Sequence, residues 1–174
     1  MMIDVDGLPA YAYTGGRPFD PERPVVVFAH GAQNDHSVWA LQSRYLAHHG
    51  CSVLALDLPG HGRSTGAPLA SIEAIAAWLL ALLDAAGVAR ATLVGHSMGS
   101  LVALEAAGTA PQRVERIALV GTAFPMKVSD ALLDGRKVRF DLGVDVLGIT
   151  VDVCLHLLRI VGNGLIGGPL GGQE

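Results

Sequence analysis

Residues 91–110 read ATLVGHSMGSLVALEAAGTA, and they combine the patterns of a strand, a tight turn and a helix. The short apolar run at 91–94 is typical of a strand buried on both faces. Residues 98–110 carry the spacing of a helix, which ends before Pro111. Only the glycine-containing turn GHSMG joins the two. A strand that passes directly into a helix in this way indicates a parallel α/β sheet.

The same alternation of short apolar runs and helical patterns extends outward from this stretch. The other expected strands are residues 3–5, 10–14, 25–29, 52–56 and 114–120, and the other expected helices are 38–49 and 71–86. Ser37 and Ser71 are the expected N-cap residues of those helices. The pattern predicts a doubly wound, mostly parallel α/β sheet with right-handed crossovers and a short hairpin, made by the first two strands, at one edge.

Composition excludes several classes of protein. The 174 residues contain 12 Lys+Arg and 16 Asp+Glu, a net charge of −4 with no basic run, so we expect no nucleic-acid partner. The N-terminus lacks the charge order of a presequence, which predicts a cytoplasmic protein. Four charged or polar side chains interrupt the apolar segment 142–161, so we expect no membrane span. Cys51 and Cys154 form no pair and are expected to be reduced.

The turn GHSMG fits the GxSxG pattern of a nucleophile elbow. In such an elbow a sharp turn pushes the serine hydroxyl, here that of Ser97, out of the sheet. The turn leaves no room for a side chain at Gly95 and Gly99. The backbone N–H of Met98, at the start of the following helix, is expected to stabilise a developing oxyanion. We expect His96, which flanks the serine, to point away and to be structural.

A second element follows the strand at 25–29, where the sequence reads His30-Gly31-Ala32. Acyl transfer needs two donors that converge on one oxygen, and the backbone N–H of Ala32 is our candidate for the second donor. His30 is an alternative candidate for a general base. A histidine at this kind of position more often makes hydrogen bonds to neighbouring loops, which is the role we favour.

Three segments in this order resemble the α/β-hydrolase family, and within it the group of esterases, haloperoxidases and C–C-bond hydrolases. They are His30-Gly31, the loop DLPGHGRS at 57–64, and the elbow. The resemblance implies that Ser97 is the nucleophile, that Met98 and Ala32 form the oxyanion hole, and that no cofactor takes part. Relatives that open epoxides or displace halide carry aspartate at the elbow, so serine favours an ester-like acyl substrate. The apolar composition of the lid-like residues 124–174 favours a small hydrophobic one.

The loop at 57–64 has a competing interpretation as a dinucleotide fingerprint. Its glycine spacing fails, because GxGxxG requires glycine at position 65 and the third glycine is Gly66. We therefore expect a rigid turn that shapes one wall of a pocket. His36, His48 and His49 are expected in solvated loop or helix-end positions, and no HExxH or Cys/His spacing predicts a metal site.

The base and acid of a triad are missing from the recognisable part of the chain. In the family the order is serine, then acid, then histidine, and His156 is the only histidine after Ser97. It lies outside any strand-loop context, so it is only an alternative candidate for the base. We expect residues 1–123 to be the N-terminal part of a hydrolase core, 124–174 to be an incomplete lid-like segment, and turnover to be slow. The alternative is a small-molecule-binding remnant without turnover. Residues 117–120 are expected to form an apolar sheet edge, which predicts either self-association through that edge or its coverage by residues 142–161.

Overall fold

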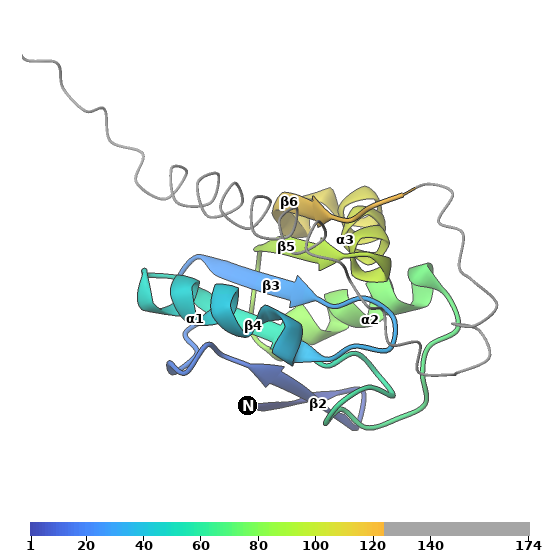
Figure 1. The fold of residues 1–174 in the computed structure, drawn as a ribbon, viewed down its shortest axis with the longest axis horizontal. Coiled ribbons are helices and arrows are strands. Elements are labelled where there is room, and N and C mark those ends of the chain that lie inside the picture. Colours follow the sequence, from blue (N-terminus) through green and yellow to red (C-terminus); the bar gives the residue numbers. More distant parts are fainter. Residues whose placement is uncertain (124–174) are drawn as a thin grey trace, which may run out of the picture. The chain divides into compact units, whose positions relative to one another are not determined.

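A computed structural model describes residues 1–123. Its elements are β1 (Met2–Val5), β2 (Leu8–Tyr13), β3 (Val25–Ala29), η1 (His36–Trp39), α1 (Ala40–His48), β4 (Ser52–Leu56), α2 (Ile72–Ala85), β5 (Ala91–His96), α3 (Met98–Thr109), η2 (Pro111–Arg113) and β6 (Val114–Val120). In this part of the chain the strands form one sheet in the order β1-β2-β4-β3-β5-β6 (Figure 1).

The sheet is mixed, with a parallel centre and an antiparallel edge. Strands β4, β3, β5 and β6 pair in parallel, whereas β1 pairs with β2 and β2 pairs with β4 in antiparallel fashion. All five residues of β3 and all five of β4 are buried, as expected for parallel strands covered on both faces. The predicted fold class, the hairpin and the doubly wound order are confirmed.

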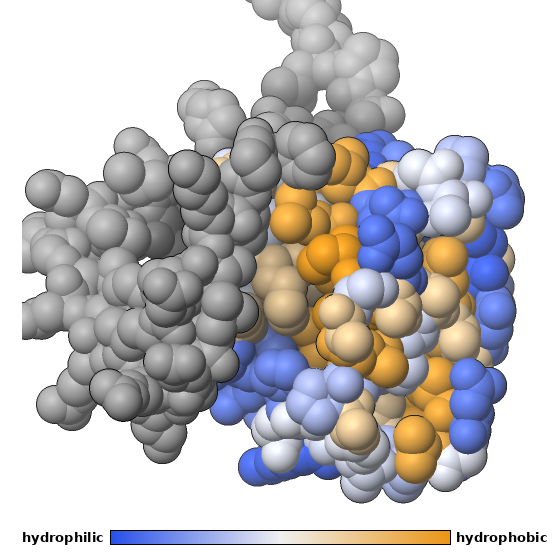
Figure 2. Space-filling model, turned by 90° about the vertical axis from the view of Figure 1, so that its right-hand side faces the viewer, coloured by the Kyte–Doolittle hydropathy of each residue, from blue (hydrophilic) through white to orange (hydrophobic). Residues whose placement is uncertain are grey.

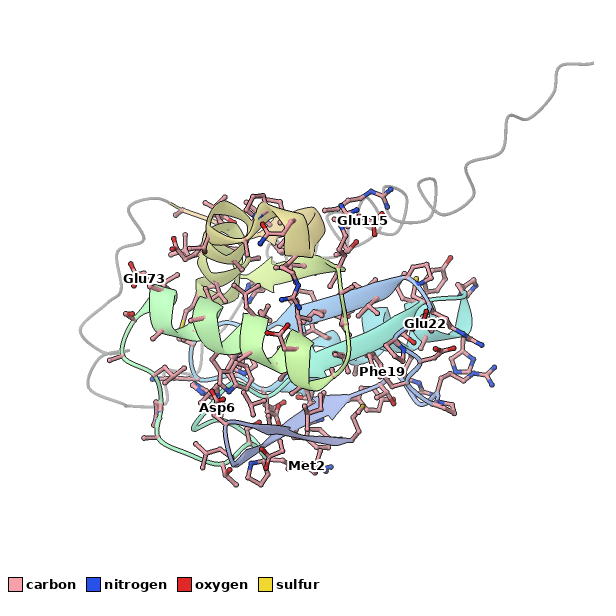
Figure 3. The ribbon with its side chains drawn as sticks, turned by 180° about the vertical axis from the view of Figure 1, so that it is seen from behind. Met2, Asp6, Phe19, Glu22, Glu73 and Glu115 are labelled. Atoms are coloured by element: carbon pink, nitrogen blue, oxygen red, sulfur yellow. The ribbon has the colours of Figure 1, made fainter. Side chains whose placement is uncertain are left out.

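Helix α1 covers one face of the sheet, and α2 and α3 cover the other (Figures 1 and 3). Seen from behind in Figure 3, α2 crosses the near face, with Glu73 in its first turn. The core on that side is made by side chains that are at most 1% exposed: Val27, Leu54, Leu56, Leu79, Leu82, Leu83 and Leu93. Each buried leucine contributes about 1.5–3 kcal/mol by leaving water. On the opposite face the rings of Phe28 and Trp39 pack together, with their centroids 4.9 Å apart.

The first helix begins differently from the prediction. Ser37 does not cap it, because the side chain of Asp35 accepts a hydrogen bond from the Ser37 amide and starts the short 3-10 turn η1. The α-helix follows only at Ala40. A carboxylate two residues earlier in the chain thus supplies the cap that was assigned to the hydroxyl. The second prediction is confirmed: Ser71 Oγ accepts a hydrogen bond from the Ala74 amide at the start of α2.

One edge of the sheet is formed by β6, which pairs only with β5 among residues 1–123. Ile117 and Leu119 on this strand remain 38% and 37% exposed. Within the same range, none of the helices is long and apolar enough to cross a lipid bilayer. The lid-like segment 124–174, with Cys154 and His156, lies outside the described residues.

Candidate active site

The chain turns sharply at Ser97, between the last residue of β5 and the first residue of α3. Ser97 has φ 52° and ψ −118°, a left-handed conformation that L-residues seldom adopt. Its amide donates to the carbonyl of Val120 at 2.9 Å, and its carbonyl accepts from the amide of Ser100 at 2.9 Å. These bonds hold the strained residue from both sides. Strain of this kind is costly and gathers at functional positions.

Both glycines of the turn are required by close backbone contacts. A Cβ on Gly95 would lie 2.0 Å from the carbonyl oxygen of Gly99, and a Cβ on Gly99 would lie 2.3 Å from the carbonyl oxygen of Ala29. No side chain fits at such distances, because the opposing atoms belong to the backbone. The close approach of α3 to the ends of β3 and β5 therefore depends on these two glycines.

The His30-Gly31-Ala32 loop lies directly against this turn. A Cβ on Gly31 would stand 3.1 Å from His96 Nδ1 and 3.2 Å from Ser97 Cβ. The structure thus brings together the two segments that the sequence places 65 residues apart. Ala32 follows in an exposed position. Its loop turns back on itself through a bond of 3.3 Å from the Asn34 amide to the Gly31 carbonyl.

His30 is fully buried and links two loops at the carboxyl end of the sheet. Its Nδ1 lies 2.7 Å from the Gly31 carbonyl oxygen, and its Nε2 accepts from the Leu58 amide at 3.1 Å. Burial lowers the pKa of the imidazole, an effect that the nearby His61 reinforces. This placement agrees with the role in loop bonding that the sequence favours over a general base.

His96 is half-buried and packs among neighbouring loops. Its ring meets the Trp39 ring edge-on at 6.4 Å, and a Cβ on Gly121 would lie 3.6 Å from its Nε2. Burial lowers the pKa of His96 below its ordinary value. His96 thus packs among other side chains, and its structural role stays a prediction.

The loop that follows β4 is organised around a buried carboxylate. Asp57 is 0% exposed, and its Oδ1 accepts from the His36 amide at 2.7 Å and lies 2.8 Å from His36 Nδ1. Its Oδ2 accepts from the Arg63 amide at 2.8 Å, and Ser64 Oγ donates to the Asp57 carbonyl at 2.6 Å. A Cβ on Gly62 would collide with Oδ2 at 2.2 Å. The loop is therefore rigid.

The prediction that His36 is solvated is wrong. Its side chain is 18% exposed and forms a hydrogen bond with Asp57. The centroid of its ring lies 4.9 Å from the centroid of the Tyr11 ring. Sequence reasoning missed this contact because the partner lies 21 residues away, although an aspartate directly after a buried strand signals a need for donors. His48 and His49 are exposed at the end of α1, as predicted.

The same region brings together ligand atoms that could reach a metal ion. One ligand atom each of Asp35, His36 and Asp57 lies within 4.8 Å of the others. Hydrogen bonds account for all three side chains: Asp35 caps η1 on the Ser37 amide, and His36 and Asp57 bond each other. The proximity of these three side chains therefore follows from the hydrogen bonds that organise η1 and the loop after β4.

The dinucleotide interpretation of the 57–64 loop does not fit the structure. In that fold the glycine-rich turn opens directly into a helix, whose N-terminus binds the pyrophosphate. Here α2 begins only at Ile72, ten positions after Gly62. The space beside Gly62 is filled by the side chain of Asp57.

Known proteins resemble part of the chain. A dihydrolipoyllysine-residue acetyltransferase component of the acetoin cleaving system, from Pseudomonas putida, is 42% identical over 99 residues, which are 56% of this chain and 26% of that protein. A 2-succinyl-6-hydroxy-2,4-cyclohexadiene-1-carboxylate synthase from Salmonella agona is 41% identical over 90 residues, 52% of this chain and 35% of that protein. The chain thus spans about a third or less of these curated relatives.

The fold and the sequence lead to the same family. The crystal structure of epoxide hydrolase A from Mycobacterium thermoresistibile superposes with a TM-score of 0.61 at 32% identity, and the match covers 68% of this chain and 37% of that one. Residues 24–143 match the family described as alpha/beta hydrolase fold. Both the elbow and the His30-Gly31-Ala32 loop lie within that range. The chain therefore belongs to the alpha/beta hydrolase fold family.

Proposed function

We propose that this chain carries the nucleophile and the oxyanion hole of a serine hydrolase that cleaves an ester-like acyl bond. The observation that carries the proposal is the left-handed backbone of Ser97 at the start of α3. Such a conformation presents the hydroxyl beyond the end of the strand. The chain holds it there at a cost in stability of about 1–3 kcal/mol.

The chemistry follows from the groups around the turn. The Ser97 hydroxyl oxygen attacks the acyl carbonyl, and the tetrahedral oxyanion accepts hydrogen bonds from the amides of Met98 and Ala32. Met98 is the first residue of α3, so no carbonyl within the helix can accept its N–H, and the helix dipole adds positive potential there. The alcohol then leaves, and water hydrolyses the acyl-enzyme.

The serine proton must pass to a general base. In the family the acid and the histidine follow the nucleophile in the chain. No histidine lies between Ser97 and residue 123, so the base belongs to a later part of the protein. His30 and His96 are unsuited, because the first has both ring nitrogens engaged and the second packs against Trp39.

A small hydrophobic acyl compound is the substrate class that we propose. Figure 2 shows the end of the molecule toward which β3 and β5 point in Figure 1, and hydrophobic residues gather over its middle. Serine at position 97 favours acyl transfer over epoxide opening, although an epoxide hydrolase is among the similar structures. The two curated relatives are named for different reactions, so their names select no single substrate.

A fluorophosphonate probe tests the proposal, because it phosphonylates an activated serine. The purified chain is incubated with the probe, and its intact mass is measured for wild type, Ser97→Ala and Ser37→Ala. Ser37 lies in an exposed turn and is the matched control. We expect a slow reaction, in line with the slow turnover that the sequence predicts, which gives one adduct in wild type and Ser37→Ala and none in Ser97→Ala. Absence of an adduct in wild type would instead favour the alternative, a binding module without turnover.

A further inference from the structure

The carbonyl of Gly31 and the amide of Ala32 belong to one peptide unit. In a trans peptide the C=O and the N–H lie in one plane and point in opposite directions. Any group that fixes the direction of the Gly31 carbonyl therefore fixes the direction of the Ala32 N–H. The imidazole of His30 is such a group, because its Nδ1 lies 2.7 Å from that carbonyl oxygen.

The bonding partners of His30 determine its tautomer. The Gly31 carbonyl can only accept a hydrogen bond, so Nδ1 must carry the proton. The Leu58 amide can only donate, so Nε2 must carry the lone pair. Both partners are satisfied only by the neutral Nδ1–H form, which suits a side chain with 0% exposure.

The chain of bonds is anchored at both ends in rigid structure. Leu58 is 1% exposed and follows Asp57, whose carboxylate fixes its own loop. At the other end, Gly31 lies against the side chains of His96 and Ser97. The Asn34 amide adds a second, longer bond to the Gly31 carbonyl at 3.3 Å. The imidazole is therefore a buried link between the loop after β4 and the loop that contains Ala32.

We propose that His30 is a positioning residue that aims the Ala32 N–H at the oxyanion through the Gly31 carbonyl. This inference rests on the proposed function, since it assigns His30 a task within the oxyanion hole. The competing explanation is that His30 only fills space and stabilises the fold. The two explanations differ in which of the ring nitrogens matters for reaction at Ser97.

Two substitutions separate the ring nitrogens. In His30→Asn the side-chain amide can place an N–H near the position of Nδ1 and still donate to the Gly31 carbonyl, but it cannot reach the Leu58 amide. In His30→Gln the longer side chain can accept from Leu58 near the position of Nε2, but it leaves the Gly31 carbonyl without that donor. Each variant loses one buried hydrogen bond, so we expect similar losses in unfolding midpoint.

The test is the second-order rate constant for phosphonylation of Ser97 in the full 174-residue chain. We expect His30→Asn to react within about threefold of wild type. We expect His30→Gln to react about tenfold more slowly, a smaller loss of rate than the 10²–10³-fold that follows removal of an oxyanion donor. Equal rates in the two variants, whether both unchanged or both slowed, would overturn the role of His30. Absence of Ser97-dependent labelling in wild type would instead overturn the proposed function, and the inference with it.

A measurement on wild type keeps the proposal testable if a variant fails to fold. The ¹⁵N shifts of selectively labelled histidine distinguish a protonated Nδ1 from a protonated Nε2. We expect the Nδ1–H form for His30 at neutral pH. The Nε2–H form or a charged ring would contradict the proposal, because the Gly31 carbonyl and the Leu58 amide could not then both be bonded as described.

Discussion

The carbonyl oxygen of Ala29 lies where a side chain on Gly99 would have to stand. The distance from that oxygen to the position of an added Cβ is 2.3 Å, and the carbonyl oxygen of His30 would be 2.7 Å away. The first turn of α3 is thus pressed against the end of β3. This contact sets the distance between Ser97, which precedes the helix, and the loop that carries Ala32.

A methyl group at position 99 would disrupt this contact. Gly99→Ala should lower the free energy of unfolding by about 3 kcal/mol, because the methyl group meets backbone that cannot move aside. Gly108→Ala is the matched control in the same helix, since nothing lies within 4 Å of its Cβ position. It should raise stability by about 0.5–1 kcal/mol. Urea denaturation measures both, and equal effects would show that the contact is absent.

The strain at Ser97 can be measured without its hydroxyl. Ser97→Gly and Ser97→Ala both remove the nucleophile, but only glycine adopts φ 52° at no cost. After allowance for the greater freedom of glycine in the unfolded chain, Ser97→Gly should be more stable than Ser97→Ala by about 1 kcal/mol. Thermal denaturation of the two variants compares them. A more stable alanine variant would mean that the turn is relaxed.

Asp57 should be among the most sensitive polar positions. Asp57→Ala leaves the amides of His36 and Arg63 without their acceptor and should cost about 3 kcal/mol or more. Asp84→Ala breaks an ion pair with Arg113 in which the Asp84 side chain is 67% exposed, and it should cost less than about 1 kcal/mol. Guanidinium denaturation measures both. A small loss at Asp57 would show that the loop is held by other contacts.

Two histidines, the buried His30 and the half-buried His96, predict that acid destabilises the fold. Burial lowers the pKa of His30 and of His96, whereas in the unfolded chain both titrate near about 6.5. Below that pH the unfolded chain binds more protons than the folded one, so the free energy of unfolding should fall as the pH falls. Burial is the largest influence on the pKa of His30. The hydrogen bond to the Gly31 carbonyl raises this pKa, the nearby His61 lowers it, and the carboxylates of Asp57 and Asp35 raise it.

Denaturation midpoints between pH 7.5 and 5 check this slope. In His30→Asn the slope should be shallower than in wild type, because one of the two imidazoles is gone. The hydrogen bonds to Ser37 lower the pKa of the Asp35 carboxyl group. This group therefore titrates at more acidic pH and does not contribute to the slope between pH 7.5 and 5. A slope that is unchanged in the variant would contradict a neutral, buried His30.

The β6 edge predicts self-association, as the sequence suggested. Ile117→Lys puts a charge on the apolar strand and should shift sedimentation toward the monomer. Leu41→Lys is the control, since Leu41 is 80% exposed but lies on α1, away from the edge. Sedimentation velocity at several concentrations compares the two variants. Association that is equally reduced in both, or absent in wild type, would contradict a role for the edge.

The sequence was most informative where local signals agreed. The strand of uniformly apolar residues at 25–29 and the turn at 95–99 each specify their structure within a few residues. The start of the first helix was predicted wrongly, because Ser37 has a typical N-cap side chain and only the three-dimensional arrangement shows that Asp35 supplies the cap. The environment of His36 depends on Asp57, a tertiary contact that no local pattern contains. The roles assigned to Ala32, Met98 and Ser97 stay predictions.

A crystal structure of the chain after reaction with a fluorophosphonate would locate the nucleophile and the oxyanion hole in one measurement. We predict a bond from phosphorus to Ser97 Oγ, with the phosphonyl oxygen about 2.7–3.1 Å from the backbone nitrogens of both Met98 and Ala32. An adduct on another residue, or a phosphonyl oxygen on Ser97 that points away from both nitrogens, would contradict the account.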